Sequence, residues 1–203
     1  KENSHSFISS SIVTIFIGIL CILANLDKDF KLNLRQTFLF SSLAWFMIAV
    51  FGSLPFLLSA QEFSFSESFF ESMSGITTTG ATIISNLDDS PKSILLWRAI
   101  MQWLGGIGIV VMAITILPLL KVGGMQLFKM EGPDSTEKIL PRTIEVAAII
   151  ISTYLILTLL CGLFYWLFGM TIFDSVCHAM TTIATGGFST HNDSIGFFKN
   201  SNI

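Results

Sequence analysis

Residues 74–83 read SGITTTGATI, an uncharged run of threonine and glycine between two long apolar blocks. A second run of this kind, TTIATGGFST, occupies residues 181–190. Glycine adopts backbone conformations with positive φ, and threonine adds a small uncharged oxygen. Two such patches in an otherwise apolar chain indicate a polar site that is built twice.

The composition is that of a membrane protein, since 52% of the 203 residues are hydrophobic and 12% are charged, with a mean hydropathy of +0.72. A bilayer core of about 30 Å needs about 20 apolar residues of helix. Four uncharged stretches reach that length, at residues 7–26, 36–60, 99–120 and 146–168. The first has no basic region ahead of it and no small-residue cleavage site behind it, so we expect a true span rather than a signal peptide. The formal net charge of −3 does not support a nucleic-acid partner.

The distribution of charge predicts which side of the membrane each connection faces. Basic residues follow the first and third spans and place these connections in the cytoplasm by the positive-inside rule: Lys28, Lys31, Arg35, Lys121, Lys129, Lys138 and Arg142. Acidic residues dominate between the second and third spans and fit the external face: Glu62, Glu67, Glu71, Asp88 and Asp89. The two assignments alternate consistently.

An internal repeat relates the two threonine and glycine patches. An offset of 107 residues places Arg35 on Arg142 and Gly80 on Gly187. It also aligns Ser68, Met73, Ile76 and Thr78 with identical residues. An offset of 106 would instead pair Gly80 with Gly186 but loses most of these matches, and the choice between the two glycines stays open. Repeats in membrane proteins commonly surround a shared site.

The segments before each patch, residues 63–75 and 171–182, are too short to cross a bilayer and too apolar for ordinary external loops. They predict re-entrant helices, whose following backbone must be buried in protein or line a polar cavity. Each short helix would point the negative end of its dipole at that cavity, and carbonyls turned inward by glycine could replace the water around a cation. External acids, including Glu62, Asp88 and Asp89, would raise the local cation concentration. The patches are therefore predicted to form an ion filter.

We accordingly expect an all-α polytopic membrane protein with repeated span, pore-loop and span units around an ion pore. The divisions are an extra N-terminal span and loop at 1–35, a first unit at 36–120 with its re-entrant helix and filter at about 63–83, a cytoplasmic linker at 121–141, and an incomplete second unit at 142–203 with its filter at about 182–189.

The motifs ITTTGA (76–81) and IATGGF (183–188), each after a predicted pore helix, resemble the first and second filter loops of the Trk/Ktr/HKT superfamily of potassium transporters, and the chain is most similar to the Trk membrane subunit. The resemblance covers roughly residues 36–203. It implies a fragment of a four-unit pore, in which the filter backbone would be Thr77, Thr78, Thr79, Gly80, Ala184, Thr185, Gly186 and Gly187.

The resemblance also implies the biological setting. Potassium would be the substrate, bound at the filter residues only and with no covalent cofactor, and uptake would occur across the bacterial cytoplasmic (inner) membrane. A homodimer over a cytoplasmic nucleotide-binding regulatory subunit is implied as well. The sequence leaves open whether transport is channel-like or an ion-coupled symport, and potassium selectivity over sodium rests on the resemblance alone.

Other functions have weaker support in the sequence. The run GGIGIV (105–110) lies inside a span without a flanking strand, so helix packing is favoured over nucleotide binding. The chain has no metalloprotease, hydrolase or Walker A motif, and we do not expect an enzyme. The remaining alternative is a structural helix-packing subunit of a membrane complex, with no ion path of its own.

Several single residues also have expected roles. His178 is expected to pack and make a hydrogen bond rather than relay protons, and Phe188 to support the loop after the filter glycines. Arg98 and Glu145, near span ends, are expected to extend to the membrane interface. Glu71 could either balance the external vestibule or pair with Arg98, and both remain open. The cysteines Cys21, Cys161 and Cys177 fit no disulfide or zinc pattern.

Overall fold

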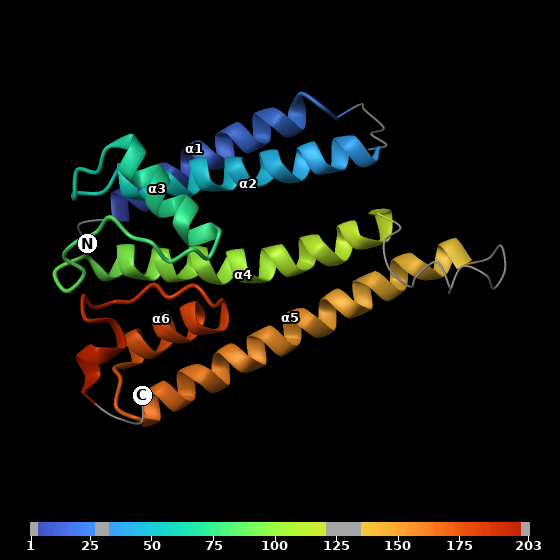
Figure 1. Ribbon diagram of the computed structural model, residues 1–203. Coiled ribbons are helices and arrows are strands. Elements are labelled where there is room, and N and C mark those ends of the chain that lie inside the picture. The colour runs from blue at the N-terminus through green and yellow to red at the C-terminus, as the bar shows by residue number, and fades with distance from the viewer. Residues whose placement is uncertain (1–3, 27–32, 121–134, 200–203) are drawn as a thin grey trace.

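The computed structural model describes residues 4–26, 33–120 and 135–199 of the chain. Within these residues it is all-helical, with four long helices, α1 (Ser4–Leu23), α2 (Leu34–Leu57), α4 (Lys92–Leu120) and α5 (Ser135–Leu167). Two short helices, α3 (Phe65–Ile76) and α6 (Ile172–Ile183), and a 3₁₀ helix at Ser194–Phe198 complete it. The long helices run side by side, and the short ones lie near one end, on either side of α4 (Figure 1).

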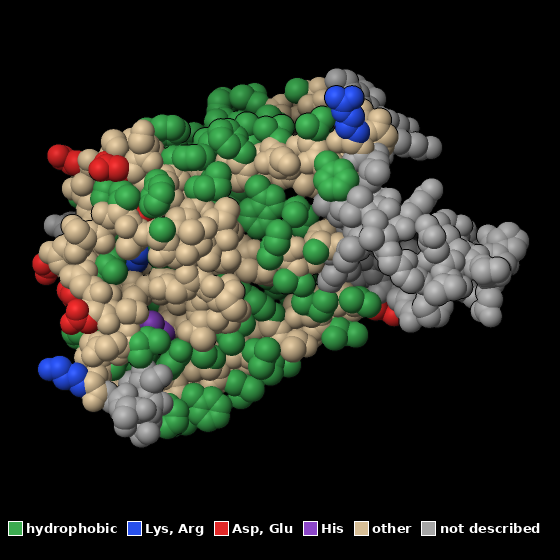
Figure 2. Space-filling model, in the orientation of Figure 1, with side chains coloured by type: hydrophobic (Ala, Val, Ile, Leu, Met, Phe, Trp, Pro, Cys, Tyr) green, Lys and Arg blue, Asp and Glu red, His purple; other side chains and the backbone are tan. Residues whose placement is uncertain are grey.

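All four long helices of the described residues are long and apolar enough to cross a membrane, over Ser4–Leu23, Arg35–Leu57, Lys92–Ala113 and Glu145–Leu167. Their sides carry exposed hydrophobic residues, whereas the charged residues visible on the described surface gather mainly at the end that holds α3 and α6 (Figure 2). No residue of the membrane-capable part of α5 is fully buried within the protein. This distribution confirms the predicted polytopic membrane protein, because surfaces of this kind are stable against lipid rather than water.

Capping residues next to each short helix fix where it begins. Ser64 caps α3 in a capping box with Glu67, and Thr171 caps α6 by accepting the N–H of Asp174. Each helix has 12 residues and spans about 18 Å, too little to cross a bilayer of about 30 Å. The bounds of the two helices differ by 107 residues at both ends, as the repeat predicts.

Two arrangements of three helices result. In the first unit, α3 lies between α2 and α4, and in the second unit α6 lies between α4 and α5 (Figure 1). Helix α4 therefore belongs to both. The first unit buries an apolar core that includes Phe56, Ile84, Leu87 and Ile94. Helix α1 packs on the outside of α2, where the Ser6 hydroxyl donates to the Leu58 carbonyl at 2.6 Å.

The predicted linker, residues 121–141, lies largely outside the described residues, as do Lys28, Lys31, Lys121 and Lys129. Helix α5 begins at Ser135, so the last part of that linker is helical. The cytoplasmic location assigned to these segments stays a prediction.

Candidate functional site

The candidate site is formed by the segments that follow the two short helices, residues 77–83 (the first loop) and 184–190 (the second loop). Both loops contain two residues with positive φ. These are Thr78 (56°) and Gly80 (77°) in the first loop, and Thr185 (55°) and Gly187 (83°) in the second. The structural match pairs Gly80 with Gly187 rather than with Gly186. The sequence left this choice open, and the structure favours the offset of 107 residues.

The same hydrogen bonds end both helices. The N–H of Thr79 donates to the carbonyl of Ser74 at 3.0 Å, and the N–H of Gly186 donates to the carbonyl of Thr181 at 2.8 Å. These bonds span five residues around a left-handed residue, as in the Schellman motif. The two loops thus leave their helices along the same backbone path.

A threonine occupies the left-handed position in each loop, where glycine is the usual residue. Positive φ is a genuine outlier for a β-branched side chain and costs roughly 1–3 kcal/mol. Strain of this kind concentrates at functional sites. Of the five non-glycine residues with positive φ in the described part of the chain, Thr78 and Thr185 are the two with β-branched side chains, which marks these loops independently of the sequence motif.

The two loops lie against each other. A Cβ atom built on Gly80 would overlap the carbonyl oxygen of Gly186. The exposure of the eight predicted filter residues differs: Thr77, Thr79, Thr185 and Gly187 are exposed, Thr78 and Gly80 are half-buried, and Ala184 and Gly186 are buried. The structure thus brings the predicted residues together from both units, while the inward orientation of their carbonyls stays a prediction.

Glycines of α4 allow this approach. A side chain at Gly105 would overlap the carbonyl of Ile76 at the end of α3, and one at Gly106 would press on Ala184. Helix packing, favoured over a nucleotide-binding interpretation of GGIGIV, is therefore what these glycines provide.

A buried ion pair lies behind the first loop. The Nε of Arg98 donates to Oε1 of Glu71 at 2.6 Å, with 1% and 2% of the two side chains exposed. Glu71 also accepts the hydroxyl of Thr82 at 2.8 Å and the N–H of Ile83 at 3.1 Å. The expectation that Arg98 extends to the membrane interface is wrong, because its side chain turns inward to neutralise a buried carboxylate. Of the two roles left open for Glu71, the structure shows the pair with Arg98.

Arg98 also reaches the second loop. Its Nη1 donates to the carbonyl of Ser189 at 3.0 Å, and its guanidinium lies 4.0 Å from the centroid of the Phe188 ring. A cation over an aromatic face is attracted by the ring quadrupole. Phe188 is 4% exposed and supports the loop, as predicted. One side chain of α4 therefore contacts the second loop directly and is linked to the first loop through Glu71.

His178 occupies the position in α6 that Glu71 occupies in α3. Its Nε2 lies 3.0 Å from the Ser189 hydroxyl and its Nδ1 lies 2.9 Å from the carbonyl of Asp174. The side chain is 3% exposed. The predicted packing and hydrogen bonding of His178 are confirmed, and they tie α6 to the second loop as Glu71 and Thr82 tie α3 to the first.

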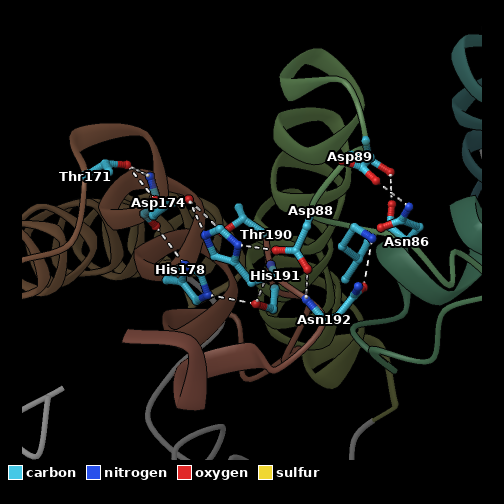
Figure 3. A network of polar contacts seen from close by, with 12 residues as sticks. Asn86, Asp88, Asp89, Thr171, Asp174, His178, Thr190, His191 and Asn192 are labelled. Carbon is cyan, nitrogen blue, oxygen red and sulfur yellow. Dashed lines mark hydrogen bonds and ion pairs between the residues drawn. The ribbon is translucent and has the colours of Figure 1, made fainter. Parts of the chain in front are cut away.

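Asp174, in the first turn of α6, anchors the end of the second loop (Figure 3). It accepts the hydroxyls of Thr171 at 2.6 Å and Thr190 at 2.7 Å. Burial alone would raise the pKa of Asp174, but these hydrogen bonds and the nearby histidines outweigh it and lower that pKa. The carboxylate is thus held in its charged form.

The residues directly after the second loop are joined to the connection between α3 and α4 by a further set of contacts (Figure 3). The Nδ1 of His191 lies 2.6 Å from Oδ1 of Asp88, while its Nε2 lies 3.6 Å from Asp174. The Oδ1 of Asn192 accepts the N–H of Leu87 at 2.8 Å. These contacts bind the two units directly to each other.

Sequence reasoning missed Asp174 and His191 and misplaced Arg98. A signal existed for two of them, since Asp174 lies in the first turn of a predicted helix and Arg98 lies close to an apolar stretch with Glu71 upstream. Nothing in the sequence pairs His191 with Asp88, which is 103 residues away. Among the described residues, no group of three or more His, Cys, Asp or Glu side chains could hold a metal ion.

Comparison with known proteins identifies the family to which the chain is similar. A family model described as "TrkH: Cation transport protein" matches residues 3–203. The chain is 45% identical over 195 residues to the Trk system potassium uptake protein TrkH of Vibrio parahaemolyticus, covering 95% of this chain and 40% of that protein. It is 49% identical over 163 residues to TrkI of Halomonas elongata, covering 80% and 33%.

A solved structure agrees with the sequence relatives. The crystal structure of the potassium transporter TrkH from Vibrio parahaemolyticus matches with a TM-score of 0.85 and 40% identity, covering 99% of this chain and 40% of that one. The chain spans about two fifths of the length of these proteins. The relatives are named as transport proteins and not as enzymes. At the level of the family, this confirms the expectation of a transporter.

Proposed function

The chain belongs to the TrkH family of cation transport proteins, and from that membership we propose that it contributes two pore-loop units to a potassium uptake system of the bacterial inner membrane. In this proposal α3 and α6 are re-entrant helices, and the first and second loops are two sides of one ion filter. Potassium is the transported substrate.

The observation that carries the proposal is the contact between two loops of the same backbone geometry. Each loop follows a short helix whose C-terminus carries partial negative charge, and each has left-handed residues at equivalent positions. Gly80 of the first unit lies against the carbonyl of Gly186 of the second unit. A repeated backbone that converges on one place suits coordination of a single cation by Thr77 to Gly80 and Ala184 to Gly187.

The proposed partners are a second copy of the membrane subunit and a cytoplasmic nucleotide-binding regulatory subunit. They follow from family resemblance, which is analogy rather than geometry. Residues 121–141, proposed to be cytoplasmic, are the segment offered for this docking. Crosslinking from cysteines engineered there should capture the regulatory subunit.

The filter assignment is tested by replacing Gly80 or Gly187 with serine or aspartate in the full-length protein. At Gly80 the new side chain meets both positive φ and the Gly186 carbonyl, while at Gly187 only φ opposes it, since no atom lies within 4 Å of a built Cβ. We expect uptake to be lost at Gly80, and lost or less selective at Gly187. Insertion should survive, because strain of about 1–3 kcal/mol is small beside the insertion of four apolar spans.

The assay is potassium and rubidium uptake, with competition by sodium, in cells that lack other uptake systems. Gly18→Ser is the matched control, because Gly18 in α1 has no close neighbour and should tolerate the change. Wild-type uptake and selectivity in both filter variants would reject the filter and favour the structural, helix-packing subunit instead.

A further inference from the structure

Gln102 lies on α4 one turn after Arg98 and is completely buried. Its Oε1 accepts the N–H of Phe188 at 3.1 Å. Phe188 follows Gly187 directly, so this bond holds the backbone at the end of the proposed filter segment of the second loop.

The same carboxamide lies beside the contact between the two loops. A Cβ atom built on Gly186 would overlap the Gln102 amide, and one built on Gly80 would lie 3.6 Å from Nε2 of Gln102. The amide is therefore in contact with the second loop and adjacent to the first. At Gly186 only a residue without a side chain leaves the amide room.

The Nε2 of Gln102 has no hydrogen-bond partner among the described residues, although it is buried. An unpaired buried donor is costly. A methionine or leucine would fill a similar volume without leaving a donor unpaired. Filling space is therefore not a sufficient account of a glutamine at this position.

We propose that Gln102 is a positioning residue that sets the separation of the first and second loops and thereby the ion selectivity of the pore. The inference rests on the proposed function, because it assumes that both loops coordinate the ion. Ion selectivity is ascribed either to the size of the cavity or to the number and field strength of the coordinating carbonyl dipoles. In both cases it depends on the spacing between the two loops. Gln102 controls that spacing by binding the second loop at Phe188 and by packing against Gly186, the residue whose carbonyl lies against Gly80.

The test uses the full-length protein and compares the preference for potassium over sodium, measured as the ratio of uptake rates. Gln102→Met keeps the volume and removes the bond to Phe188, and it should lower the ratio about two- to tenfold, as expected for one lost hydrogen bond at a discriminating site. Gln102→Glu keeps an acceptor for Phe188 and, once protonated by burial, a donor in the place of Nε2. It should retain more of the ratio than Gln102→Met does.

The matched control is Gln61→Met. Gln61 also has a buried amide atom without a partner, but its Nε2 bonds to Ser90 at 3.1 Å, away from the loops. This variant should keep the wild-type ratio. If Gln102→Met does not reach the membrane, Gln102→Asn, which retracts the amide by one methylene, is expected to lower the ratio in the same way.

A wild-type ratio in the inserted Gln102 variants would overturn the inference and leave the proposed function standing. An equal loss in Gln102→Met and Gln102→Glu would also overturn it, because the bond to Phe188 would then not be what positions the loop. Absence of potassium uptake by the wild-type protein would overturn the proposed function and this inference with it.

Discussion

In the first unit, α3 is tied to its loop by a charged group, since Glu71 accepts from Thr82 and is neutralised by Arg98. In the second unit, the equivalent contact is made by His178 and Ser189. The backbones of the two loops nevertheless share their helix ends, their hydrogen bonds and their positive φ angles. The shared path is therefore set locally, by the way each short helix ends, and the side chains behind it can differ.

The difference has a consequence for how each unit is stabilised. A buried ion pair is sensitive to loss of one partner, whereas a hydrogen bond between two polar groups is less so. Helix α4 links the two different arrangements, because its Arg98 contacts both Glu71 and the Ser189 carbonyl. The arginine that neutralises Glu71 in the first unit thus also donates a hydrogen bond to the second loop.

The largest effect is expected from Arg98→Met, which leaves Glu71 buried and unpaired. The variant should lose about 3–5 kcal/mol of stability, and the double variant with Glu71→Gln should recover part of it, because no uncompensated charge remains. His178→Leu, the corresponding change in the second unit, should cost about 1–3 kcal/mol. Thermal unfolding of the purified protein in detergent measures all three. Equal losses in Arg98→Met and His178→Leu would mean that the two units are held alike.

An intermediate effect is expected from relieving the strain of the left-handed threonines. Thr78→Gly should raise stability by about 1 kcal/mol, because glycine adopts positive φ freely. Thr185→Gly should gain less, since the Thr185 hydroxyl donates to the Ala184 carbonyl at 2.7 Å and this bond is lost. The same unfolding measurement applies. A decrease in stability for Thr78→Gly would show that its side chain contributes more than its strain costs.

The smallest effect concerns the first-turn acids Glu67 and Asp174. Hydrogen bonds from Ser64 lower the pKa of Glu67, and those from Thr171 and Thr190 outweigh burial to lower the pKa of Asp174. The folded pKa lies below the unfolded one in both cases, so each stabilising contribution is present above the unfolded pKa and is lost as pH falls through the folded pKa. Asp174→Asn should therefore reduce the loss of stability between pH 7 and about pH 3.

Glu67→Gln should change that pH dependence less, because Glu67 is exposed and its interactions are screened by solvent. Melting temperatures of the wild type and both variants at the two pH values provide the test. If Asp174→Asn showed the pH dependence of the wild type, the contacts of Asp174 would contribute nothing to acid sensitivity.

Much of the fold could be predicted from sequence because it depends on patterns that are local or repeated. Length and hydropathy located four spans, and the repeat of 107 residues located both short helices and their loops. Capping residues such as Ser64 and Thr171 fix helix starts within a few residues of themselves. These features need no knowledge of which elements pack together.

The contacts between the units could not be predicted in the same way. Whether Arg98 extends outward or turns inward depends on the rotation of α4 about its axis, which nearly uniform hydrophobicity around a membrane helix leaves undefined. The place of Gln102 beside the contact between the loops depends on the same rotation. The pairing of His191 with Asp88 depends on how distant segments meet. These contacts come from tertiary packing, and single-sequence patterns do not encode it.

The two hydrogen-bond partners of Arg98 among the described residues lie on opposite sides of it in the order of synthesis. Glu71 precedes Arg98 by 27 residues, and Ser189 follows it by 91. When the ribosome delivers α4 to the membrane, the carboxylate that neutralises the guanidinium has already emerged, while the carbonyl of the second loop has not been made. The arginine can therefore enter the bilayer as half of a neutral helical hairpin, and the later unit then assembles onto a cation that is already in place.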